Sequence, residues 1–569
     1  MQHVEVRRDE QIGWYEASLP LRERKKRGHF STPPTLVERI LDACGYSPDA
    51  DLWHIRVLDP ACGSGNFLAG AAQRLLQFGE QMQLAPQERA ELVQRNIWGF
   101  DPDPVSCFLA HMQLSAITND VCITGNPHMH QADSLALQWE PCVDLFLANP
   151  PYLAAKNNDL SGYRLAQQRG QADSYLLFLE LALRVTRPGG WIGLVLPDPV
   201  LARLNAARER TQLLKQATLH HLWHLSGVFA AEVGAVVLVA QNTPAKSAHQ
   251  ISWTRGNWRT TSNASPCPAN AQQIAQSLFL SQPAAELRYL LSSEGGALLD
   301  RLRVSLHDAS EGERRFAPLS EFVAISRGEE LGRESPFLTP VEPESEIGAT
   351  RAGTKGGGPA PTLHETACES AVQGRGRACP RPGVSDNYGA STTRYPVLRG
   401  GVDICPYGAP QASWWIEREA VTKPLTRYLS PKLLVVKSTD RLQATLDMGG
   451  HVALQTLYLL HMRSPQEHDM LYFLLALLNS RLLRAYVYNL HTAYKWVQPQ
   501  IEQRVLANLP VPLSEPAQQR PIIEQARQLM NACSRSGAVV EWDAEITSMY
   551  EELERNIRAL YALALMQGM

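Results

Sequence analysis

The chain has 569 residues, of which 44% are hydrophobic and 20% are charged. This length exceeds what one ordinary hydrophobic core accommodates, so we expect two or three domains. The formal net charge of −3 excludes a basic surface over the whole molecule, and any contact with nucleic acid must come from a local patch.

Cysteine usage and apolar runs restrict the class of protein further. Ten cysteines are scattered without a CxxC pair, which indicates neither a zinc site nor a disulfide framework and fits a reducing cytoplasm. The N-terminal "MQHVEVRRDE" lacks the apolar core of a signal peptide. The longest apolar run, "MLYFLLALL" at 470–478, is too short to span a bilayer. We therefore expect a cytoplasmic protein that contacts no membrane and binds no metal.

From residue 28 onward, short apolar runs alternate with longer helical patterns, which is typical of an α/β domain with a parallel sheet. Two helices are predicted between the strands, "NFLAGAAQRLLQF" and "SYLLFLELALRVTRPGG", the second ending at Pro188-Gly189-Gly190. The predicted strands are 55–59, 97–101, 143–149, 191–197, 219–225 and 234–240.

The rest of the chain is organised differently. The stretch "GATRAGTKGGGPAP" (348–361) has no large apolar side chain and cannot contribute to a core, which predicts a disordered insertion. The last helix, predicted from "AEITSMYEELERNIRALYAL", is amphipathic. The predicted division is an N-terminal extension (1–27), a catalytic domain (28–242), the start of a recognition region (243–337), the insertion (338–393), and a recognition domain with C-terminal helices (394–569).

A glycine loop follows the first strand, in "LDPACGSGNFL" (58–68). Gly63 and Gly65 allow a tight turn and a close approach to a ligand, with the next helix N-terminus directed at it. The loop lacks the third glycine of the dinucleotide fingerprint and carries Asp59 at the strand end. A carboxylate there repels a pyrophosphate but suits a cationic ligand such as an ammonium or a sulfonium.

Two further acids follow the next strands. Asp101 in "GFDPDP" is placed to accept hydrogen bonds from both ribose hydroxyls, and its alternative role is a helix cap. Asp133 in "HQADSL" could accept a bond from an adenine amino group or lie in a surface turn. Three acids and a glycine loop together suit a ligand with an ammonium, a ribose and an adenine, such as S-adenosylmethionine.

The fourth strand runs directly into Asn149-Pro150-Pro151-Tyr152. Prolines donate no hydrogen bond and end strand pairing. Each also forces the preceding residue into an extended conformation. The sequence therefore predicts a rigid corner that presents an amide, carbonyl groups and an aromatic ring.

Taken in order, these motifs resemble the gamma-class N6-adenine DNA methyltransferases, and in particular a subgroup with a C-terminal target-recognition domain that also occurs in type IIG restriction enzymes. The resemblance covers residues 28–242 closely and later segments more loosely. It implies a class I S-adenosylmethionine-dependent methyltransferase fold, α/β and Rossmann-like, followed by a mixed α/β recognition domain with C-terminal helices. The motifs are "GHFSTPPTLVERIL", "LDPACGSGNFL", "GFDPDP", "ADSL", "NPPY", "FLELALRVTRPGGWIGLVLPD" and "SGVFAAEVGAVVLVA", then "YPVLRGGVDICPY" and "LLALLNSRLLRAYVY".

The resemblance also implies the residues that hold S-adenosylmethionine. They are Thr32 and Pro33 for the methionine part, Asp59 and Gly63 with Ala61 and Gly65 of the same loop for the amino acid end, Asp101 for the ribose, and Asp133 for the adenine.

The corner gains a chemical interpretation from the same resemblance. The Asn149 side-chain carbonyl and the Pro150 backbone carbonyl would accept the two hydrogens of an adenine N6 amine, which localises the nitrogen lone pair toward the methyl group. The base must leave the duplex stack, and Tyr152 offers a ring to receive it. Pro151 completes the motif. Phe229 would be the opposing ring, although a core aromatic is an equally good interpretation of Phe229.

The C-terminal half carries the expected DNA contact. Residues 394–512 contain 13 Lys and Arg against 8 Asp and Glu, interleaved with aromatic residues, which suits the DNA backbone and grooves; an ordinary mixed surface is the alternative. Only 27 residues precede "GHFSTPP" and no nuclease pattern is evident, so we expect modification of double-stranded DNA without cleavage. A separate restriction endonuclease or other defence subunits are the candidate partners.

Two other functions stay open on the sequence. "NPPY" also serves methyltransferases of RNA or of protein glutamine, although the roughly 320 residues after the catalytic half exceed what a compact glutamine methylase needs. A DNA-binding subunit of a defence complex, without catalysis, is the other alternative.

Overall fold

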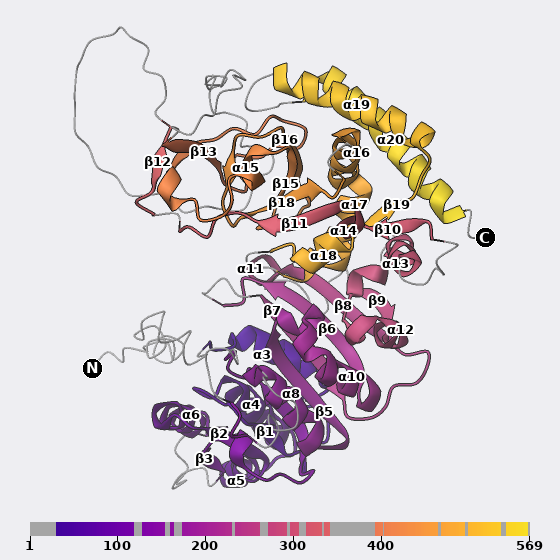
Figure 1. The fold of residues 1–569 in the computed structure, drawn as a ribbon. Coiled ribbons are helices and arrows are strands. Elements are labelled where there is room, and N and C mark those ends of the chain that lie inside the picture. Colours follow the sequence, from indigo (N-terminus) through magenta and orange to yellow (C-terminus); the bar gives the residue numbers. More distant parts are fainter. Residues whose placement is uncertain are drawn as a thin grey trace. The chain divides into compact units, whose positions relative to one another are not determined.

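The computed structural model describes the chain in segments and divides it into two compact units (Figure 1). Unit 1 comprises residues 1–292 with 494–497, and unit 2 comprises 293–493 with 498–569. The described residues are 30–118, 128–153, 160–163, 173–229, 234–261, 271–292, 296–306, 314–332, 335–341, 393–401, 403–464, 468–495, 499–535 and 542–566.

Unit 1 is built on one nine-stranded sheet in the order β3-β2-β1-β4-β5-β7-β6-β8-β9. The first five of these strands in space run parallel, and β7 is antiparallel to both of its neighbours. The strands are β1 (Val57–Asp59), β2 (Ile97–Asp101), β3 (Met129–Gln131), β4 (Val143–Ala148), β5 (Thr186–Pro197), β6 (Thr218–Ser226), β7 (Ala235–Gln241), β8 (Gln250–Asn257) and β9 (Gln272–Ala275).

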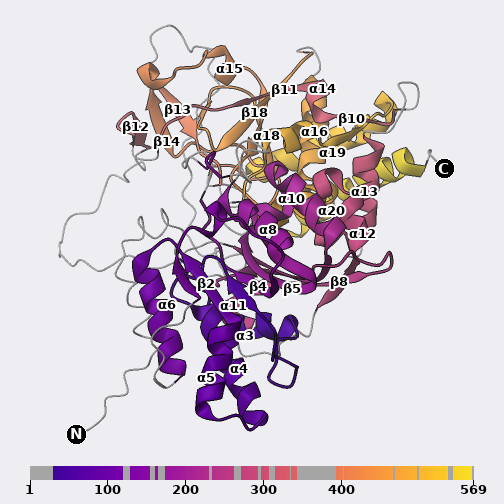
Figure 2. The ribbon, with the colours of Figure 1, turned by 90° about the horizontal axis from the view of Figure 1, so that it is seen from below.

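Helices cover both faces of this sheet (Figures 1 and 2), which confirms the predicted Rossmann-like α/β fold. The alternation along β4 divides its side chains between two cores, because successive residues of a strand point to opposite faces: Phe146 packs with α8 and α10, whereas Leu145 packs with α3 and α4. The helices are α3 (Pro34–Ala43), α4 (Asn66–Gln81), α5 (Pro86–Asn96), α6 (Pro104–Ile117), α8 (Ser174–Val185), α9 (Pro199–Ala202), α10 (Ala207–Gln216), α11 (Trp258–Thr261) and α12 (Gln276–Ser281).

Two features of unit 1 differ from the sequence prediction. Helix α8 ends at Val185, before the Pro-Gly-Gly stretch, and β5 begins at once. The register of β5 against β4 shifts between Val143 and Leu145, so the glycines lie in an irregular part of the strand. In addition, β8 and β9 pair into the sheet, so the boundary predicted at residue 242 lies inside unit 1, which extends to residue 292.

Unit 2 contains a two-stranded sheet and two four-stranded sheets, in the orders β10-β19, β11-β18-β15-β16 and β12-β14-β13-β17. The strands are β10 (Phe316–Pro318), β11 (Val323–Arg327), β12 (Leu338–Pro340), β13 (Arg394–Leu398), β14 (Trp414–Glu417), β15 (Lys432–Val436), β16 (Ala444–Asp447), β17 (Val452–Ala453), β18 (Leu457–Met462) and β19 (Pro510–Pro512).

The helices of unit 2 include the long C-terminal pair α19 and α20, which pack on each other. Ile546, Tyr550, Leu553 and Ile557 are buried on one face of α20, as the amphipathic pattern predicts. The predicted mixed α/β domain with C-terminal helices is therefore confirmed. The helices are α13 (Gly296–Ser305), α14 (Leu319–Phe322), α15 (Thr426–Leu429), α16 (His468–Asn479), α17 (Arg481–Leu490), α18 (Gln503–Ala507), α19 (Pro516–Arg535) and α20 (Ala544–Met566).

The predicted insertion falls mostly outside the described residues. Of 338–393, residues 338–340 form β12, and 342–392 are not described. Within the described ranges no single helix is long and apolar enough to cross a membrane, and α16 with the stretch Arg481–Tyr494 meets that criterion only as a pair bent by 55°.

Candidate active site

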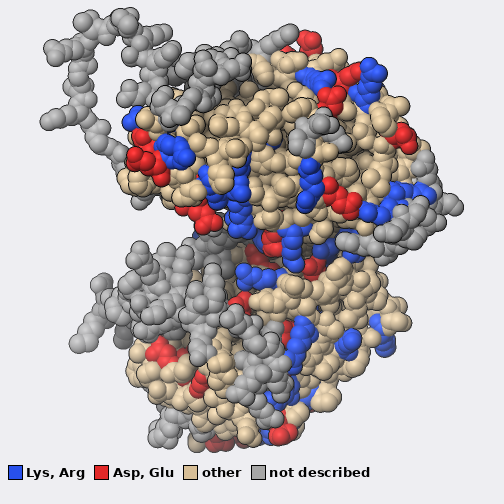
Figure 3. All heavy atoms as spheres, viewed as in Figure 1, with Lys and Arg blue, Asp and Glu red and all other residues tan. Residues whose placement is uncertain are grey.

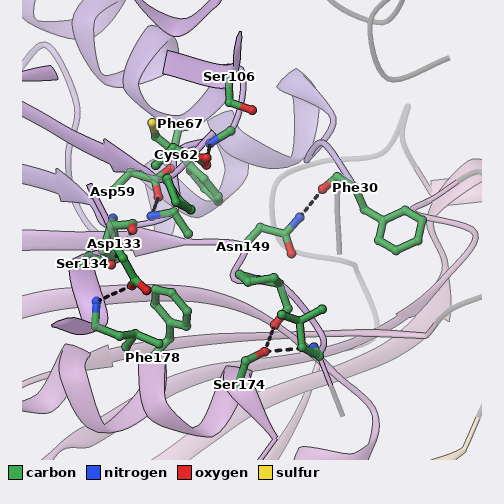
Figure 4. Close-up of a pocket in the computed structure, with 18 of the residues that line it drawn as sticks. Phe30, Asp59, Cys62, Phe67, Ser106, Asp133, Ser134, Asn149, Ser174 and Phe178 are labelled. Atoms are coloured by element: carbon green, nitrogen blue, oxygen red, sulfur yellow. Dashed lines mark hydrogen bonds between the residues drawn. The ribbon is translucent and has the colours of Figure 1, made fainter. Parts of the chain in front are cut away.

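Polar side chains gather at the carboxyl edge of the parallel strands of unit 1. Asp59 ends β1 and Asp101 ends β2, while Asp133 and Asn149 follow β3 and β4. Because these four strands are neighbours and run in one direction, the side chains lie along one edge, where ligands bind in open α/β sheets. All four line one cavity of about 210 Å³ (Figure 4).

The glycine loop forms one wall of this cavity. Gly63 has a φ of +52° and lines the cavity, and a Cβ added to it would meet nothing within 4 Å. Gly65, with a φ of +92°, does not line the cavity; a Cβ there would lie 2.8 Å from the Cβ of Ala110 on α6. Gly63 therefore leaves room at the cavity, whereas Gly65 is required for the close packing of the loop on α6.

Asp59 is a buried carboxylate beside the loop. Its side chain is 2% exposed and accepts a hydrogen bond of 3.1 Å from the Ala61 backbone N–H. Burial raises the pKa of Asp59 to about 8, the Ala61 bond lowers that pKa, and the charge of Asp101 raises it. No ion pair to Asp59 is present among the described residues. A cation bound next to it would favour its ionised form.

Asp101 holds the loop and also faces the cavity. Its Oδ2 accepts from the Gly63 N–H at 3.0 Å, and its Oδ1 accepts from the Asp103 N–H at 2.9 Å. Asp101 also lines the cavity, where its carboxylate can act only as an acceptor when ionised. The alternative role of a helix cap belongs to Asp103, the N-cap of α6, whose side chain accepts from the Val105 N–H at 3.2 Å. The ribose contact of Asp101 stays a prediction.

Asp133 likewise accepts hydrogen bonds from neighbouring residues and faces the cavity. Its Oδ1 accepts from the Leu135 N–H at 3.0 Å, and its Oδ2 accepts from the Tyr163 hydroxyl at 2.5 Å. Burial, with the bond to Asp133 and its charge, raises the pKa of Tyr163 to about 12, so the phenol stays protonated and donates. Tyr163 also lines the cavity, on the side where the adenine is predicted.

The side-chain amide of Asn149 has a defined orientation. Its Nδ2 donates to the backbone carbonyl of Phe30 at 2.5 Å, a bond drawn in Figure 4. Its Oδ1 accepts from the Tyr152 hydroxyl at 3.1 Å, and the same hydroxyl lies 3.2 Å from the carbonyl oxygen of Val195 on β5. Since Oδ1 has two lone pairs, one remains for a further donor.

The aromatic rings at the corner pack on each other. Tyr152 and Phe229 meet edge to face, with centroids 6.5 Å apart and planes at 73°, and Phe30 lies 5.7 Å from Phe229. Phe229 is buried in the core on the α3 side of the sheet, and neither Tyr152 nor Phe229 lines the cavity. A base stacked on both rings requires parallel planes, so it could enter between them only after one ring turns.

The segment before α3 covers the cavity from another side. Thr32 lines the cavity, and its buried hydroxyl has no hydrogen-bond partner among the described residues. The Asn66 side chain donates to the Thr32 carbonyl at 2.9 Å, which ties this segment to the start of α4. Pro33 is the N-cap of α3 and does not line the cavity.

Several lining residues were not predicted from the sequence. Ser174, the first residue of α8, contacts the corner directly, and its only sequence signal is a small polar residue at a helix start. Tyr163 and Phe30 carry no recognisable signal, because their contacts are with residues far away in the chain. Among the described residues no group of His, Cys, Asp and Glu could hold a metal ion. The lining residues outside the predicted set are Phe30, Ser31, Pro60, Cys62, Ser64, Asn66, Phe67, Pro102, Ser106, Ser134, Leu135, Leu153, Leu160, Tyr163, Ser174 and Phe178.

Known protein families match both units. Residues 15–252 match the N-6 DNA methylase family, and residues 398–511 match the TaqI-like C-terminal specificity domain. The first match covers the corner, the glycine loop and all three acids. The second lies within the recognition domain predicted at 394–569.

Individual relatives resemble the catalytic part of the chain. The type II methyltransferase M.PaeR7I of Pseudomonas aeruginosa is 30% identical over 185 residues, which is 30% of this chain and 32% of that protein. The EcoEI methylase subunit of a type I restriction enzyme from Escherichia coli is 28% identical over 231 residues, 39% of this chain and 43% of that protein. The match thus spans between 20% and 43% of the length of the curated relatives.

Among solved structures, the fold of the type IIL restriction-modification enzyme MmeI, determined in complex with DNA, is similar over 97% of this chain and 78% of that chain, with a TM-score of 0.59 and 12% identity. At this identity the similarity concerns the fold. The matches confirm the expected combination of domains: the chain carries a catalytic domain of the N-6 DNA methylase family and a TaqI-like C-terminal specificity domain.

Proposed function

We propose that this protein transfers a methyl group from S-adenosylmethionine to the N6 amine of a specific adenine in double-stranded DNA, within a restriction-modification or related defence system. The observation that carries the proposal is the orientation of Asn149. Its Nδ2 is bonded to the Phe30 carbonyl, so its Oδ1 is the group left to accept from a substrate amine. That acceptor lines the same cavity as the three acids.

The chemistry of the cavity fits the proposed cofactor. Asp59 is buried without a counter-ion among the described residues, and an ammonium group bound beside it would favour its ionised form over the protonated form that burial favours. The Thr32 hydroxyl supplies a buried donor without a partner in the described structure. Asp101 and Asp133 line the cavity with carboxylates that would accept from ribose hydroxyls and from an adenine amine. When bound, the cofactor would supply an electrophilic methyl group on a sulfonium.

The corner residues would activate and place the acceptor amine. An adenine N6 amine is a poor nucleophile because its lone pair is delocalised into the ring. Two acceptors, Asn149 Oδ1 and the Pro150 carbonyl, would take its two hydrogens and pull the nitrogen toward tetrahedral geometry. Both acceptors stand on a segment held from three sides, so little reorganisation is needed when the base arrives.

The flipped base needs a receiving surface. We assign this role to the Tyr152 ring, with Phe229 opposite it after a ring rotation. Unpairing the target base costs a few kcal/mol, and stacking on an aromatic ring offsets part of that cost.

Unit 2 is the proposed reader of the DNA sequence. Among the described residues, ion pairs within the unit engage Arg394, Arg399, Lys432, Arg481 and Arg504 of the basic region 394–512. On the face drawn in Figure 3, basic side chains are interspersed with acidic ones. Lys437 lies near another cation. Burial and the charge of Arg327 lower the pKa of Lys437, and the charge of Glu330 acts in the opposite direction. A phosphate near Arg327 and Lys437 would relieve that repulsion.

The alternatives carry less support. The specificity-domain match favours DNA over RNA or a protein glutamine as the substrate. The relatives include methylase subunits of type I enzymes, so partner subunits such as a restriction endonuclease remain part of the proposal. The six described free cysteines fit the expected reducing cytoplasm.

The direct test uses S-adenosylmethionine labelled on its methyl group. The protein is incubated separately with unmethylated bacterial genomic DNA, with RNA and with a cell protein extract. We expect label only in DNA, as N6-methyladenine at one recurring sequence that sequencing then identifies. Label in RNA or in protein instead would contradict the proposal.

A further inference from the structure

The two prolines of the corner provide no backbone hydrogen-bond donors that could fix the segment in place. Pro150 and Pro151 have no N–H groups, so neither can anchor the segment by donating a hydrogen bond. The proposed reaction nevertheless needs the Pro150 carbonyl and the Asn149 side chain at fixed positions. Contacts from other elements must therefore anchor this stiff segment to the rest of unit 1.

Ser174 makes three hydrogen bonds to this segment. Its hydroxyl donates to the Pro151 carbonyl, and the hydroxyl oxygen accepts from the Leu153 N–H at 2.9 Å (Figure 4). Its backbone N–H donates to the Leu153 carbonyl at 2.9 Å. The peptide groups on both sides of Tyr152 are thus bonded to one residue, which is itself 2% exposed.

The hydroxyl of Ser174 has little left to offer a ligand. A serine hydroxyl carries one hydrogen, and that hydrogen is already donated to Pro151. Ser174 lines the cavity, yet its donor points at the corner. Its contribution is therefore to the placement of the corner.

Two other contacts involve side chains of the corner, those of Asn149 and Tyr152. The Phe30 carbonyl holds the Asn149 amide, and the Val195 carbonyl lies near the Tyr152 hydroxyl. Ser174, in contrast, bonds to backbone groups of the corner, namely the Pro151 carbonyl and the Leu153 N–H. Without its hydroxyl, the Pro151 carbonyl and the Leu153 N–H lose these bonds inside a buried region, and the chain there must shift to find other partners.

On the basis of the proposed function, we propose that Ser174 is a positioning residue for methyl transfer. By bonding both peptide groups that flank Tyr152, it holds the Pro150 carbonyl and the Asn149 side chain in register with the acceptor amine. The residue acts through the corner and does not touch the reacting atoms. A displacement of about 1 Å at such a site can lower the rate on the order of 100-fold.

The test compares single-turnover methyl transfer by the full-length protein and its variants on a duplex that contains the identified site. Ser174→Ala removes the hydroxyl and keeps the backbone bond. We expect its rate constant to fall roughly 10- to 100-fold at full reaction amplitude, with affinity for S-adenosylmethionine unchanged within about threefold. Ser174→Thr retains a hydroxyl and should recover most of the rate.

The amplitude of the single-turnover reaction distinguishes a positioning role of Ser174 from a loss of stability. A variant that is partly unfolded loses amplitude, because fewer molecules react, while the molecules that do react keep the normal rate constant. Thr218→Val is the matched control. It removes another buried hydroxyl of unit 1, which donates to the Thr243 carbonyl at 2.8 Å at the opposite edge of the sheet, and its rate constant should equal that of the wild type.

Two results would overturn the role of Ser174. One is a Ser174→Ala rate constant within twofold of the wild type, and the other is a loss of amplitude alone. A wild-type protein that labels no DNA would instead refute the proposed function, and the role of Ser174 with it. The wild-type reaction in the same experiment therefore distinguishes the two failures.

Discussion

Two buried aspartates, one in each unit, have opposite surroundings. Asp59 in unit 1 and Asp447 in unit 2 are both 2% exposed. Asp59 has one hydrogen bond from a backbone N–H and no cation among the described residues, and burial raises its pKa to about 8. Asp447 bonds to the Lys432 ammonium at 2.7 Å and to His451 Nδ1 at 3.1 Å.

For Asp447, burial alone would raise the pKa, but the His451 bond and the Lys432 charge together bring that pKa below its ordinary value. Glu329 in the same unit follows this pattern, with bonds from Thr422, from the Lys423 N–H and from Tyr428 that outweigh the effect of its burial. A buried carboxylate whose partners outweigh the effect of burial contributes to the fold, whereas one such as Asp59, whose partners do not, is a candidate for a ligand site.

The largest expected effect concerns the buried ion pair between Lys432 and Asp447 in unit 2. Asp447→Ala leaves the Lys432 ammonium buried without its carboxylate, which should cost about 3–5 kcal/mol in the free energy of unfolding of unit 2. Thermal unfolding with and without S-adenosylmethionine assigns the transitions, because a bound ligand shifts only the transition of unit 1. The double variant Lys432→Met with Asp447→Leu should recover most of the loss. Equal instability of the single and double variants would contradict the pair's role.

The next effect concerns Asn149 and is expected on the rate of methyl transfer, with the stability of unit 1 unchanged. Asn149→Ala removes an acceptor used chiefly in the transition state, so methyl transfer should slow by about 10²–10³-fold, equivalent to roughly 3–4 kcal/mol. Affinity for S-adenosylmethionine and the unfolding temperature of unit 1 should stay near wild-type values. Isothermal calorimetry and single-turnover kinetics measure the two quantities. Weak cofactor binding by this variant would refute the assignment of Asn149 to the substrate amine.

Asp59→Asn should separate ligand binding from stability. Losing a charged partner for the ammonium weakens S-adenosylmethionine binding by about 1.5–3 kcal/mol, on the order of 10- to 100-fold. The folded-state pKa of Asp59 lies above its unfolded value, so its contribution to stability falls as the pH rises from about 4 toward 8. The variant should therefore unfold at a higher temperature than the wild type near pH 8 without ligand. Asp51→Asn, at an exposed aspartate, is the control that should change neither quantity.

The pH dependence of cofactor binding follows from the same group. Below pH 8 much of Asp59 is protonated, and an ammonium ligand requires the carboxylate. Binding should release a proton near pH 7, and affinity should rise by up to about tenfold per pH unit toward pH 8. Calorimetry in two buffers with different ionisation enthalpies counts the protons released. A pH-independent affinity in the wild type would exclude this role for Asp59.

The smallest effect concerns the Tyr152 hydroxyl. Tyr152→Phe keeps the ring and removes the bond to Asn149 Oδ1, so the rate should fall only about 3- to 10-fold, equivalent to roughly 0.5–1.5 kcal/mol. Tyr152→Ala also removes the stacking surface, worth about 1–3 kcal/mol. A mismatch at the target adenine eases flipping and should partly rescue Tyr152→Ala. Asn149→Ala should gain nothing from the mismatch, and equal rescue of both would contradict this division of roles.

The sequence alone predicted the Rossmann-like fold and the edge of the sheet at which the three acids and Asn149 lie. Apolar runs that end in Asp59, Asp101 and Asn149 predict parallel strands, and parallel neighbours bring their carboxyl ends to one edge without further information. The sequence also distinguished two parts of the chain, although the boundary that it predicted at residue 242 falls inside unit 1. These features are local, since each depends on residue types within a few positions.

Tertiary structure decided everything that depends on distance in space. The extension of unit 1 to residue 292 arises because β8 and β9 pair with a sheet formed much earlier in the chain. Asn149 is oriented by Phe30, which lies 119 positions away, and the corner is held by Ser174. The raised pKa of Asp59 results from its burial beneath the assembled loops. Hydrogen-bond partners and solvent exposure are set by which segments meet in the folded chain, and no local pattern of residues specifies them.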